Sequence, residues 1–353
     1  MDSPESSIVA CLRKQAGWCE LLGSSLYAFL LEQAAADVEI RGPCWDVLRG
    51  HDSDPPGLAL ALRFMGAVHR VVLVGMAPEL ARHYPSMNGT PELTECWPAF
   101  RATVARHVEL LREWICRPVQ TNEVGRCAAL IGGFLLVARE SNLPLRLLEI
   151  GSSAGLNLRW DHYYYEAGGA KWGDPASPVH LTGAFAAGSP PFDVPASVIE
   201  RRGCDLSPVD AETEEGRLTL LSFVWADQSS RLAGMRGAME LARKVQLRVE
   251  MADAAQWLDR NLSSVIPGAA TVVFHSIVAP YMSESGYKQL VDVLSRAGKA
   301  ATKAAPLAWL RMEPGSAQAD VRLTIWPEGE ERLIATTSFH GRDIRWLVEG
   351  SGR

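Results

Sequence analysis

The sequence lacks an excess of basic residues. Its 353 residues include 35 Lys and Arg against 41 Asp and Glu, which gives a formal net charge of −6. Proteins that bind nucleic acids over a broad surface usually carry a basic excess, because they neutralise phosphates. We therefore expect no nucleic-acid partner.

Long apolar runs are also missing. The longest run, Cys127–Ala138, lies between Arg126 and Arg139, and it is shorter than the roughly 20 residues that a membrane-spanning helix needs. The sequence does not open on a basic segment followed by an apolar one, so no secretion signal is expected. These absences predict a cytoplasmic protein without a membrane partner, and they favour a buried helix at Cys127–Ala138.

Cysteine is sparse and dispersed. None of the seven cysteines forms a C-x-x-C pair, and no histidine lies at zinc-ligand spacing from any of them. Small apolar residues in a reducing compartment are the simplest interpretation of that pattern. We expect neither a structural metal nor a disulfide framework. The sequence also lacks a P-loop and a G-x-S-x-G nucleophile motif.

Helical periodicity dominates the first 140 residues. Apolar side chains recur at three- and four-residue steps, which places them on one face of a helix. Gly23-Ser24-Ser25 marks a break or a new cap within the first segment. The pattern predicts an all-helical N-terminal domain over residues 1–140. Its predicted helices are Cys11–Ala35, Gly57–Met76 and Pro91–Arg117.

Residues 141–353 alternate predicted strands with predicted helices, an order that gives an α/β sheet with right-handed crossovers. Short β-like runs around Gly168-Gly169 predict a hairpin inserted at about residues 162–182. Turns containing glycine join the last three strands, so the sheet is expected to be mostly parallel and to end antiparallel. The predicted strands are Leu145–Ile150, Val198–Asp205, Gln246–Met251, Thr271–Val278, Pro306–Met312, Val321–Trp326, Arg332–Phe339 and Asp343–Val348; helices are predicted at Ser153–Trp160, from a cap at Ser207-Pro208, and at Ser229–Val245, Ala254–Leu262 and Ser285–Lys299.

The segment Glu149-Ile-Gly151-Ser-Ser-Ala-Gly155 follows the first predicted strand. Gly151 permits a tight turn there, and Gly155 lets the next element pack closely against the strand. Amides exposed at a helix start favour a polar or anionic ligand group. Ser153 stands where a dinucleotide fingerprint has its middle glycine, which disfavours a pyrophosphate cofactor such as NAD. The alternative is a plain strand–helix turn.

Two acidic residues follow the next two predicted strands. Asp205 ends one of them, where a ribose diol is held by paired hydrogen bonds in nucleotide-binding sheets. Asp253 follows the other, where a carboxylate can accept a hydrogen bond from an adenine amino group. Each has a structural alternative, since Asp205 can cap a helix at Ser207 and Asp253 can cap Ala254–Leu262.

In this order the segments E-x-G-x-x-x-G, G-x-D-L-S-P, A-D-A and TVVFHS resemble a class I S-adenosylmethionine-dependent methyltransferase over residues Leu145–Val348. The resemblance implies a Rossmann-like sheet and S-adenosylmethionine as the cofactor. It implies that the glycine turn faces the amino-acid part of the cofactor, Asp205 its ribose and Asp253 its adenine. The turn residues predicted to bind cofactor are Glu149, Gly151, Ser152, Ser153, Gly155 and Asn157.

A closer resemblance covers nearly the whole chain. Five separated segments are similar to a bacterial family of unknown function that looks related to the methyltransferases and has a helical N-terminal part. This resemblance implies a fold and a pocket without naming a substrate. The segments are VQTNEVGR, EIGSSAGLNLRWDHYYY, GCDLSPVD, VWADQSSRL and FHGRDIRW.

Further polar residues cluster before and after the turn. Asn122 and Arg126 precede an apolar helix and are predicted to lie over the glycine turn, with Arg126 pairing a ligand carboxylate; the alternative is a helix cap near Asn122. Of the three consecutive tyrosines at 163–165, not all are expected to be buried on one strand face. The predicted substrate-lining residues are His162, Tyr164, Trp225, Asp227 and Arg231, with a helix cap as the alternative for Asp227.

His275 ends the fourth predicted core strand and is the candidate general base. Tyr281 and Glu313 occupy comparable positions after this strand and the next. A buried, hydrogen-bonded histidine is the alternative for His275. Together these residues predict a methyltransferase that acts on an unidentified small molecule, with the helical domain as lid or substrate wall. A non-catalytic S-adenosylmethionine- or nucleoside-binding protein of the same fold is the rival hypothesis.

Overall fold

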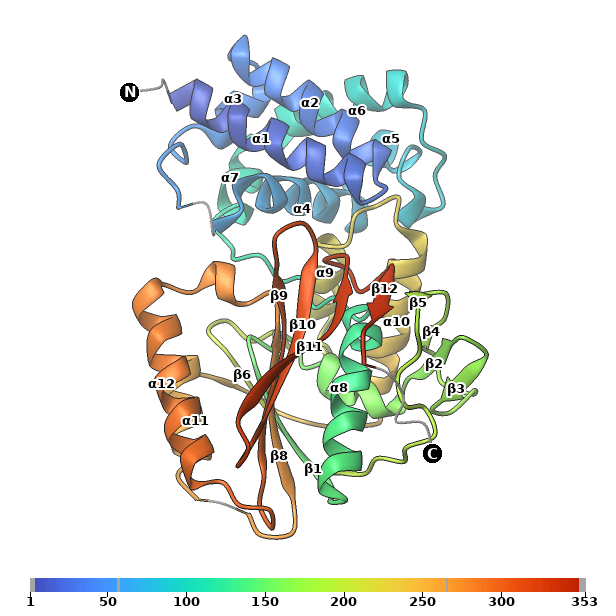
Figure 1. Cartoon of the computed structure of the whole chain (residues 1–353). Coiled ribbons are helices and arrows are strands. Elements are labelled where there is room, and N and C mark those ends of the chain that lie inside the picture. The colour runs from blue at the N-terminus through green and yellow to red at the C-terminus, as the bar shows by residue number, and fades with distance from the viewer. Residues whose placement is uncertain (1–3, 56–57, 265, 349–353) are drawn as a thin grey trace. The chain divides into compact units, whose positions relative to one another are not determined.

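The computed structural model describes residues 4–55, 58–264 and 266–348 (Figure 1). The chain divides into two compact units. The first, named here the helical unit, holds Met1–Thr121 and Thr213–Ala233. The second, the sheet unit, holds Asn122–Glu212 and Gly234–Arg353. The later segment of the helical unit cannot be recognised from local sequence periodicity, because its packing partners lie far away in the chain.

The helical unit contains the predicted N-terminal helices in a more divided form. The predicted helix over Cys11–Ala35 is interrupted at Gly23, which has a φ of +80°, and Ser24 caps the second helix by accepting the Tyr27 amide. The predicted helix Pro91–Arg117 is two helices that meet at His107. Its elements are α1 (Pro4–Leu21), α2 (Ser25–Glu39), α3 (Pro43–Leu48), α4 (Leu60–Leu73), α5 (Pro78–Ala81), η2 (Pro85–Met87), α6 (Leu93–Arg106), α7 (Val108–Trp114), α9 (Glu214–Ser222) and the start of α10 (Ser229–Ala242).

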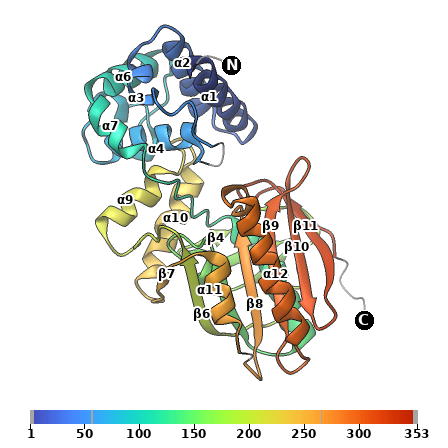
Figure 2. The same cartoon turned by 90° about the vertical axis from the view of Figure 1, so that its left-hand side faces the viewer.

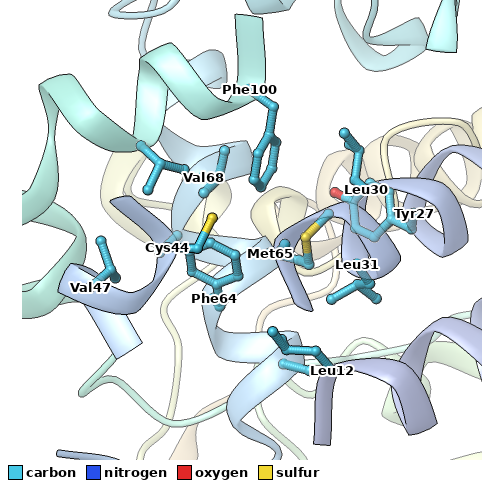
Figure 3. Packing of buried hydrophobic residues seen from close by; sticks show 14 of the residues in the cluster. Leu12, Tyr27, Leu30, Leu31, Cys44, Val47, Phe64, Met65, Val68 and Phe100 are labelled. Atoms are coloured by element: carbon cyan, nitrogen blue, oxygen red, sulfur yellow. The ribbon is translucent and has the colours of Figure 1, made fainter. Parts of the chain in front are cut away.

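Apolar side chains from α1, α2, α3, α4 and α6 meet in the core of the helical unit (Figure 3). Phe64 of α4 and Phe100 of α6 pack edge to face, with ring centroids 5.9 Å apart. The apolar faces expected from the helical periodicity are therefore the ones that are buried.

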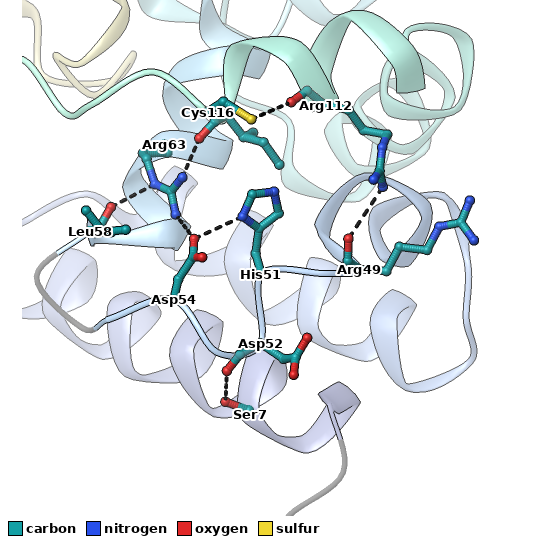
Figure 4. A network of polar contacts seen from close by, with 10 residues as sticks. Ser7, Arg49, His51, Asp52, Asp54, Leu58, Arg63, Arg112 and Cys116 are labelled. Atoms are coloured by element: carbon teal, nitrogen blue, oxygen red, sulfur yellow. Dashed lines mark hydrogen bonds and ion pairs between the residues drawn. The ribbon is translucent and has the colours of Figure 1, made fainter.

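A polar clip holds the loop before α4 (Figure 4). The buried guanidinium of Arg63 donates to the Leu58 carbonyl oxygen at 2.7 Å and to the Ile115 carbonyl oxygen at 2.5 Å. It also pairs with the carboxylate of Asp54, which His51 contacts at 2.9 Å. One buried cation thus joins the loop to the end of α7.

The sheet unit is built on a mixed sheet in the order β5-β12-β11-β10-β9-β8-β1-β6-β7. The strands β7, β6, β1, β8 and β9 run parallel, whereas β10, β11 and β12 continue antiparallel from β9. This confirms the predicted α/β class with antiparallel C-terminal strands. The strands are β1 (Leu145–Ile150), β5 (Phe185–Ala187), β6 (Val198–Asp205), β7 (Val249–Met251), β8 (Ala270–Ser276), β9 (Leu307–Pro314), β10 (Ala319–Trp326), β11 (Glu330–Thr337) and β12 (Ile344–Trp346).

Helices cover both faces of this sheet (Figures 1 and 2). On one face, α8 (Arg126–Ser141) packs its Phe134 edge to face against Phe274 of β8. On the other face, α11 (Ala254–Asn261) and α12 (Glu284–Ala300) share an apolar cluster with Leu148 and Val273. The boundary predicted at residue 140 places α8 with the N-terminal helices. In the structure it belongs to the sheet unit, because its buried side chains pack on the strands.

Two predicted helices do not form. Residues 153–156 make a turn, and only the 3-10 helix η3 (Asn157–His162) follows it. No helix begins at Ser207-Pro208; α9 begins at Glu214 with Thr213 as its cap. At both places the backbone bonds across the two loops instead of forming a helix: Ser153 N donates to Asp205 Oδ2, and Val209 N donates to the Ser153 carbonyl oxygen.

The predicted insertion after the first turn is a small separate sheet. Its strands β2 (Tyr164–Ala167) and β3 (Ala170–Trp172) pair antiparallel across Gly168-Gly169, and β4 (His180–Leu181) pairs parallel with β2. Trp160 of η3 stacks between Phe134 of α8 and Trp172 of β3, with centroids 4.5 and 5.2 Å away. These aromatic contacts fix the insertion to the α8 face of the main sheet.

Candidate functional site

The candidate site lies where the carboxyl ends of β1 and β8 meet. The parallel strands run in the order 3-2-1-4-5, counted along the chain, and a doubly wound sheet of this order binds its ligands at the switch point between strands 1 and 4. Here these are β1 and β8. Ligand-binding residues are therefore expected directly after Ile150 and Ser276.

Backbone strain is concentrated at this point. Ser153 has a φ of +53° and Ile277 a φ of +54°, and a β-branched residue in this region is a genuine outlier. Such strain persists only where the surroundings over-determine it, and it clusters at functional sites. Gly151, with a φ of +62°, lies against Val278, since a Cβ atom at Gly151 would be 2.5 Å from Val278 Cγ2. The turns after β1 and β8 are thus packed on each other.

The amides of the glycine turn are occupied by side chains of the protein itself. Ser153 N donates to Asp205 Oδ2 at 2.8 Å. The amides of Ala154 and Leu156 both donate to Asn122 Oδ1, at 3.3 and 3.0 Å. We expected exposed amides that could bind an anionic ligand group. This is wrong for these three amides, because Asp205 and Asn122 from two distant loops already accept their hydrogen bonds.

Asn122 has a structural role that is open to measurement. Asn122→Ala removes one acceptor from two buried amides, and an unsatisfied buried donor costs about 1–3 kcal/mol. We expect the free energy of unfolding from urea denaturation to fall by about that amount. Thr121→Ala, at the neighbouring half-buried position, is the matched control and should change it by less than about 0.5 kcal/mol. Equal effects of both variants would contradict this role.

Asp205 joins the loops after β1 and β6. Its Oδ2 accepts the Ser153 amide and its Oδ1 accepts the Ser207 amide, each at 2.8 Å. Asp205 thus caps its own loop locally, as one alternative had it, without starting a helix. A carboxylate has about four lone-pair positions, so each oxygen keeps an acceptor position for a diol.

Two exposed apolar side chains flank Asp205 and Asp253. Leu206 is 74% exposed and Met251 is 77% exposed, and Met251 is the register neighbour of Asp205 in β7. Asp253 caps α11 by accepting the Gln256 amide at 3.0 Å, which confirms the capping alternative and leaves its second oxygen for other donors. Sequence reasoning missed Leu206 and Met251, although large apolar residues directly after strand ends were a signal.

Glu149 is a carboxyl group buried beneath the glycine turn. The residue is 2% exposed, and its Oε2 is buried without a hydrogen-bond partner. It pairs in register with Phe274, so it lies on the sheet face that α8 covers. Burial raises the pKa of Glu149 well above its ordinary value; the charge of Asp205 raises it further, whereas Arg159 and Arg126 lower it.

Arg126 and Asn157 lie on the same side as Glu149. Arg126 donates from Nε to the Phe339 carbonyl oxygen at 3.1 Å and from Nη1 to the Ser276 carbonyl oxygen at 2.9 Å. Asn157 Oδ1 accepts the Cys127 thiol at 3.3 Å. Arg126 therefore holds the end of β8 as well as contributing positive potential to the site.

His275 points away from this group. Side chains alternate along a strand, so His275 lies on the face of Val273, opposite Phe274 and Glu149. It is 1% exposed. Trp309 Nε1 donates to its Nε2 at 3.0 Å, and its Nδ1 lies 2.6 Å from Glu313 Oε1. With both ring nitrogens engaged, the geometry favours the buried, hydrogen-bonded alternative over a general base.

Glu313 supports the strained turn after β8. Its Oε1 accepts the Val278 amide at 2.9 Å and its Oε2 accepts the Ala279 amide at 3.2 Å. Tyr281, half exposed, ends the short helix η4 (Ala279–Tyr281) that follows. His275 and Glu313 thus act on the site through the turn that carries Val278, whereas Tyr281 remains available for a ligand.

The three consecutive tyrosines are all buried, but they do not share one strand face, as expected. Tyr163 precedes β2 and donates to the Leu156 carbonyl oxygen at 2.6 Å, so it does not compete for a strand face. Tyr164 donates to Glu166 at 2.7 Å within the inserted sheet. His162 is partly exposed beside the ion pair of Asp161 and Arg201.

The remaining predicted substrate residues belong to the helical unit. Asp227 accepts Ser24 Oγ at 2.7 Å and the Leu26 amide at 3.2 Å, so it caps α2. Trp225 packs near Tyr27, with centroids 6.1 Å apart, and lies under the guanidinium of Arg231. Each therefore has a packing role within that unit.

Among the described residues, no helix combines the length and apolarity needed to cross a membrane. Within the same part of the chain, no group of three or more His, Cys, Asp or Glu residues is arranged to hold a metal ion.

Comparison with known proteins gives one match. The model of a family described as "Uncharacterized protein conserved in bacteria (DUF2332)" matches residues 9–346. Searches of curated proteins and of solved structures found no match.

Proposed function

The chain belongs to this family of bacterial proteins, and we propose that it is an S-adenosylmethionine-dependent methyltransferase acting on a small molecule. The observation that carries the proposal is the buried carboxyl group of Glu149. Its unpartnered oxygen lies beneath a strained glycine turn at the switch point of the sheet. An orphaned buried acceptor is costly unless a ligand donor satisfies it, and the α-ammonium of a methionine moiety is such a donor.

The neighbouring strand ends offer matching groups for the rest of this cofactor. The open acceptor positions of Asp205 suit the two hydroxyls of a ribose. Leu206 and Met251 give apolar surface for the adenine ring, and removal of such surface from water is favourable. Asp253, after β7, is the acceptor for the adenine amino group. The three parts of the cofactor thus follow the order of β1, β6 and β7.

The occupied amides of the glycine turn argue against a dinucleotide. A pyrophosphate needs free amides and close backbone approach at this turn. Here Asp205 and Asn122 take the amides of Ser153, Ala154 and Leu156. A cofactor without a pyrophosphate loses nothing by this arrangement.

Methyl transfer is an in-line displacement, so alignment of the two reactants and exclusion of water can supply much of the rate. Because His275 is engaged on both nitrogens, we assign it a positioning role through Glu313 and the turn at Val278. Tyr281 is suited to donate a hydrogen bond to a substrate and not to accept a proton, because desolvation raises its pKa above the ordinary value of a tyrosine. The substrate itself stays undefined beyond a small molecule.

A non-catalytic binding protein is the second candidate. The engagement of His275 by Trp309 and Glu313 favours it, since this leaves the site without a buried general base. Such a protein would bind S-adenosylmethionine as a signal rather than consume it. Formation of S-adenosylhomocysteine across a panel of small metabolites separates the two, because binding without turnover supports the second candidate.

Isothermal titration calorimetry with S-adenosylmethionine tests the proposal. Asp205→Ala removes hydrogen bonds to a charged group that are worth about 1.5–3 kcal/mol, so we expect the dissociation constant to rise roughly 10- to 100-fold. Asp259→Ala is the matched control and should bind like wild type, since Asp259 of α11 forms an exposed ion pair with Arg296 of α12.

Three outcomes would count against the assignment. Wild type that fails to bind at millimolar cofactor would overturn both candidates. Competition by NAD as effective as that by S-adenosylhomocysteine would restore a dinucleotide enzyme. Equal affinities of Asp205→Ala and wild type would remove the ribose role. The melting temperature of Asp205→Ala must be measured alongside, because the variant also loses the acceptor for Ser153 and Ser207.

A further inference from the structure

Glu149 is a buried acid without an ion pair. Among the described residues, no basic side chain lies within ion-pairing distance of its carboxyl group, and its Oε2 accepts no hydrogen bond. Another buried acid differs. Asp37 pairs with Arg101 and accepts the Cys44 amide. Glu149 thus lacks the partners that stabilise the charge of Asp37.

The nearest arginines are committed to main-chain oxygens. Arg159 of η3 donates from Nε to Val245 and from Nη1 to Gly155, both at 2.8 Å. Arg126 of α8 likewise donates to Phe339 and Ser276. These bonds fix both guanidinium groups at a distance, so that they act on Glu149 through their field alone.

The other groups around Glu149 do not compensate its charge. From β6, Asp205 adds a second negative charge. From α8, Cys127 is a buried thiol, and after η3 Tyr163 is a buried phenol; burial raises the pKa of both well above the ordinary values, so both stay neutral. An isolated carboxylate in such surroundings takes up a proton rather than stay charged.

We propose that Glu149 holds a proton while the site is empty and releases it to solvent when a cationic nitrogen of the ligand binds beside it. The step exchanges one positive charge for another: the carboxylic O–H bond breaks, the proton goes to water, and the carboxylate accepts the N–H of the ligand. The inference rests on the proposed function for the identity of the ligand, whose ammonium group is the cation. It makes binding tighter as the pH rises.

The protonated state can be tested without ligand. A carboxyl group whose pKa is raised by folding contributes stability that is complete below its unfolded value, near 4.3, and is lost as pH rises through the folded value. Glu149→Gln keeps the shape and cannot ionise. We therefore expect the melting temperature of the variant, relative to wild type, to increase by about 2–4 °C or more between about pH 5 and pH 8.

The matched control is Glu140→Gln. Glu140 lies on α8, is partly exposed and pairs with Arg332, so its replacement should give a difference from wild type that does not increase with pH. Because the comparison uses the change with pH, a constant offset from imperfect packing of the glutamine does not affect it. A difference between Glu149→Gln and wild type that stays flat over this range would overturn the inference.

Proton release is measured in a second arm. Titration of S-adenosylmethionine in two buffers of different ionisation enthalpy should show release of about one proton per cofactor bound by wild type. Glu149→Gln should show none, whatever its affinity. Equal release by both proteins would overturn the inference even if the cofactor binds. Failure of the cofactor to bind would overturn the proposed function instead, and the ligand-free arm would then decide the state of Glu149 by itself.

Discussion

Gly151→Ala is expected to destabilise the sheet unit by about 3 kcal/mol and to weaken S-adenosylmethionine binding. The new Cβ atom adds a left-handed backbone penalty of roughly 1–2 kcal/mol to an overpacking penalty of roughly 1–3 kcal/mol. The overpacking arises because this atom would lie 2.5 Å from Val278 Cγ2. Urea denaturation and calorimetric titration measure the two effects.

Two further variants separate strain from contact. Gly169→Ala, in the turn between β2 and β3, has a φ of +84° but open space around its Cβ position, so it should show the backbone penalty alone. Gly151→Ala combined with Val278→Ala should recover part of the loss, because the contacting methyl groups are gone. If Gly151→Ala and Gly169→Ala lower the free energy of unfolding equally, close packing between the turn after β1 and the turn after β8 is contradicted.

Arg63→Met is expected to lower the stability of the helical unit by about 3–5 kcal/mol, the usual effect of breaking a buried ion pair. The change removes the donors that Leu58 and Ile115 use and leaves Asp54 without its cation. Loss of helical circular dichroism in urea measures the effect. Since the clip joins a loop to α7, the midpoint of the urea unfolding transition should shift to a lower urea concentration.

Arg49→Met is the control for this change. Arg49 belongs to the same region (Figure 4), but its side chain is 59% exposed and lies 4.0 Å from its ion-pair partner Asp46. Exposed pairs contribute little, so we expect a change below about 0.5 kcal/mol. A comparable loss in both variants would show that burial does not set the strength of the clip.

For the candidate base His275, the sequence predicted the position in a strand but not the sheet face on which the side chain lies. Its place at the end of a parallel strand was predicted correctly, and so was its neighbour Glu313 at the end of the next strand. Which face of the sheet the ring occupies depends on strand register. That register places it with Trp309 and α12, away from Glu149. A shift of one residue in the strand register would have placed His275 on the same sheet face as Glu149.

The sequence by itself determined the local elements whose pattern is carried by neighbouring residues. Leu145–Ile150 forms a fully buried strand over its predicted bounds, as a near-continuous apolar run in a parallel sheet does. Val198–Asp205 is also a strand over its predicted bounds. Asp253 caps α11 as its position before an amphipathic segment implied. The bacterial family was recognisable from its segments in the same way.

Only the tertiary structure decided which groups satisfy the glycine turn and which acid remains unsatisfied. Asn122 and Asp205 reach the amides of Leu147–Asn157 from loops that are distant in sequence, and Trp225 joins a helical core rather than the sheet. Such partners depend on strand order and on long-range packing, which no local pattern encodes. The same packing buries Glu149 and holds Arg159 and Arg126 on main-chain oxygens, so the fold sets the protonation of Glu149.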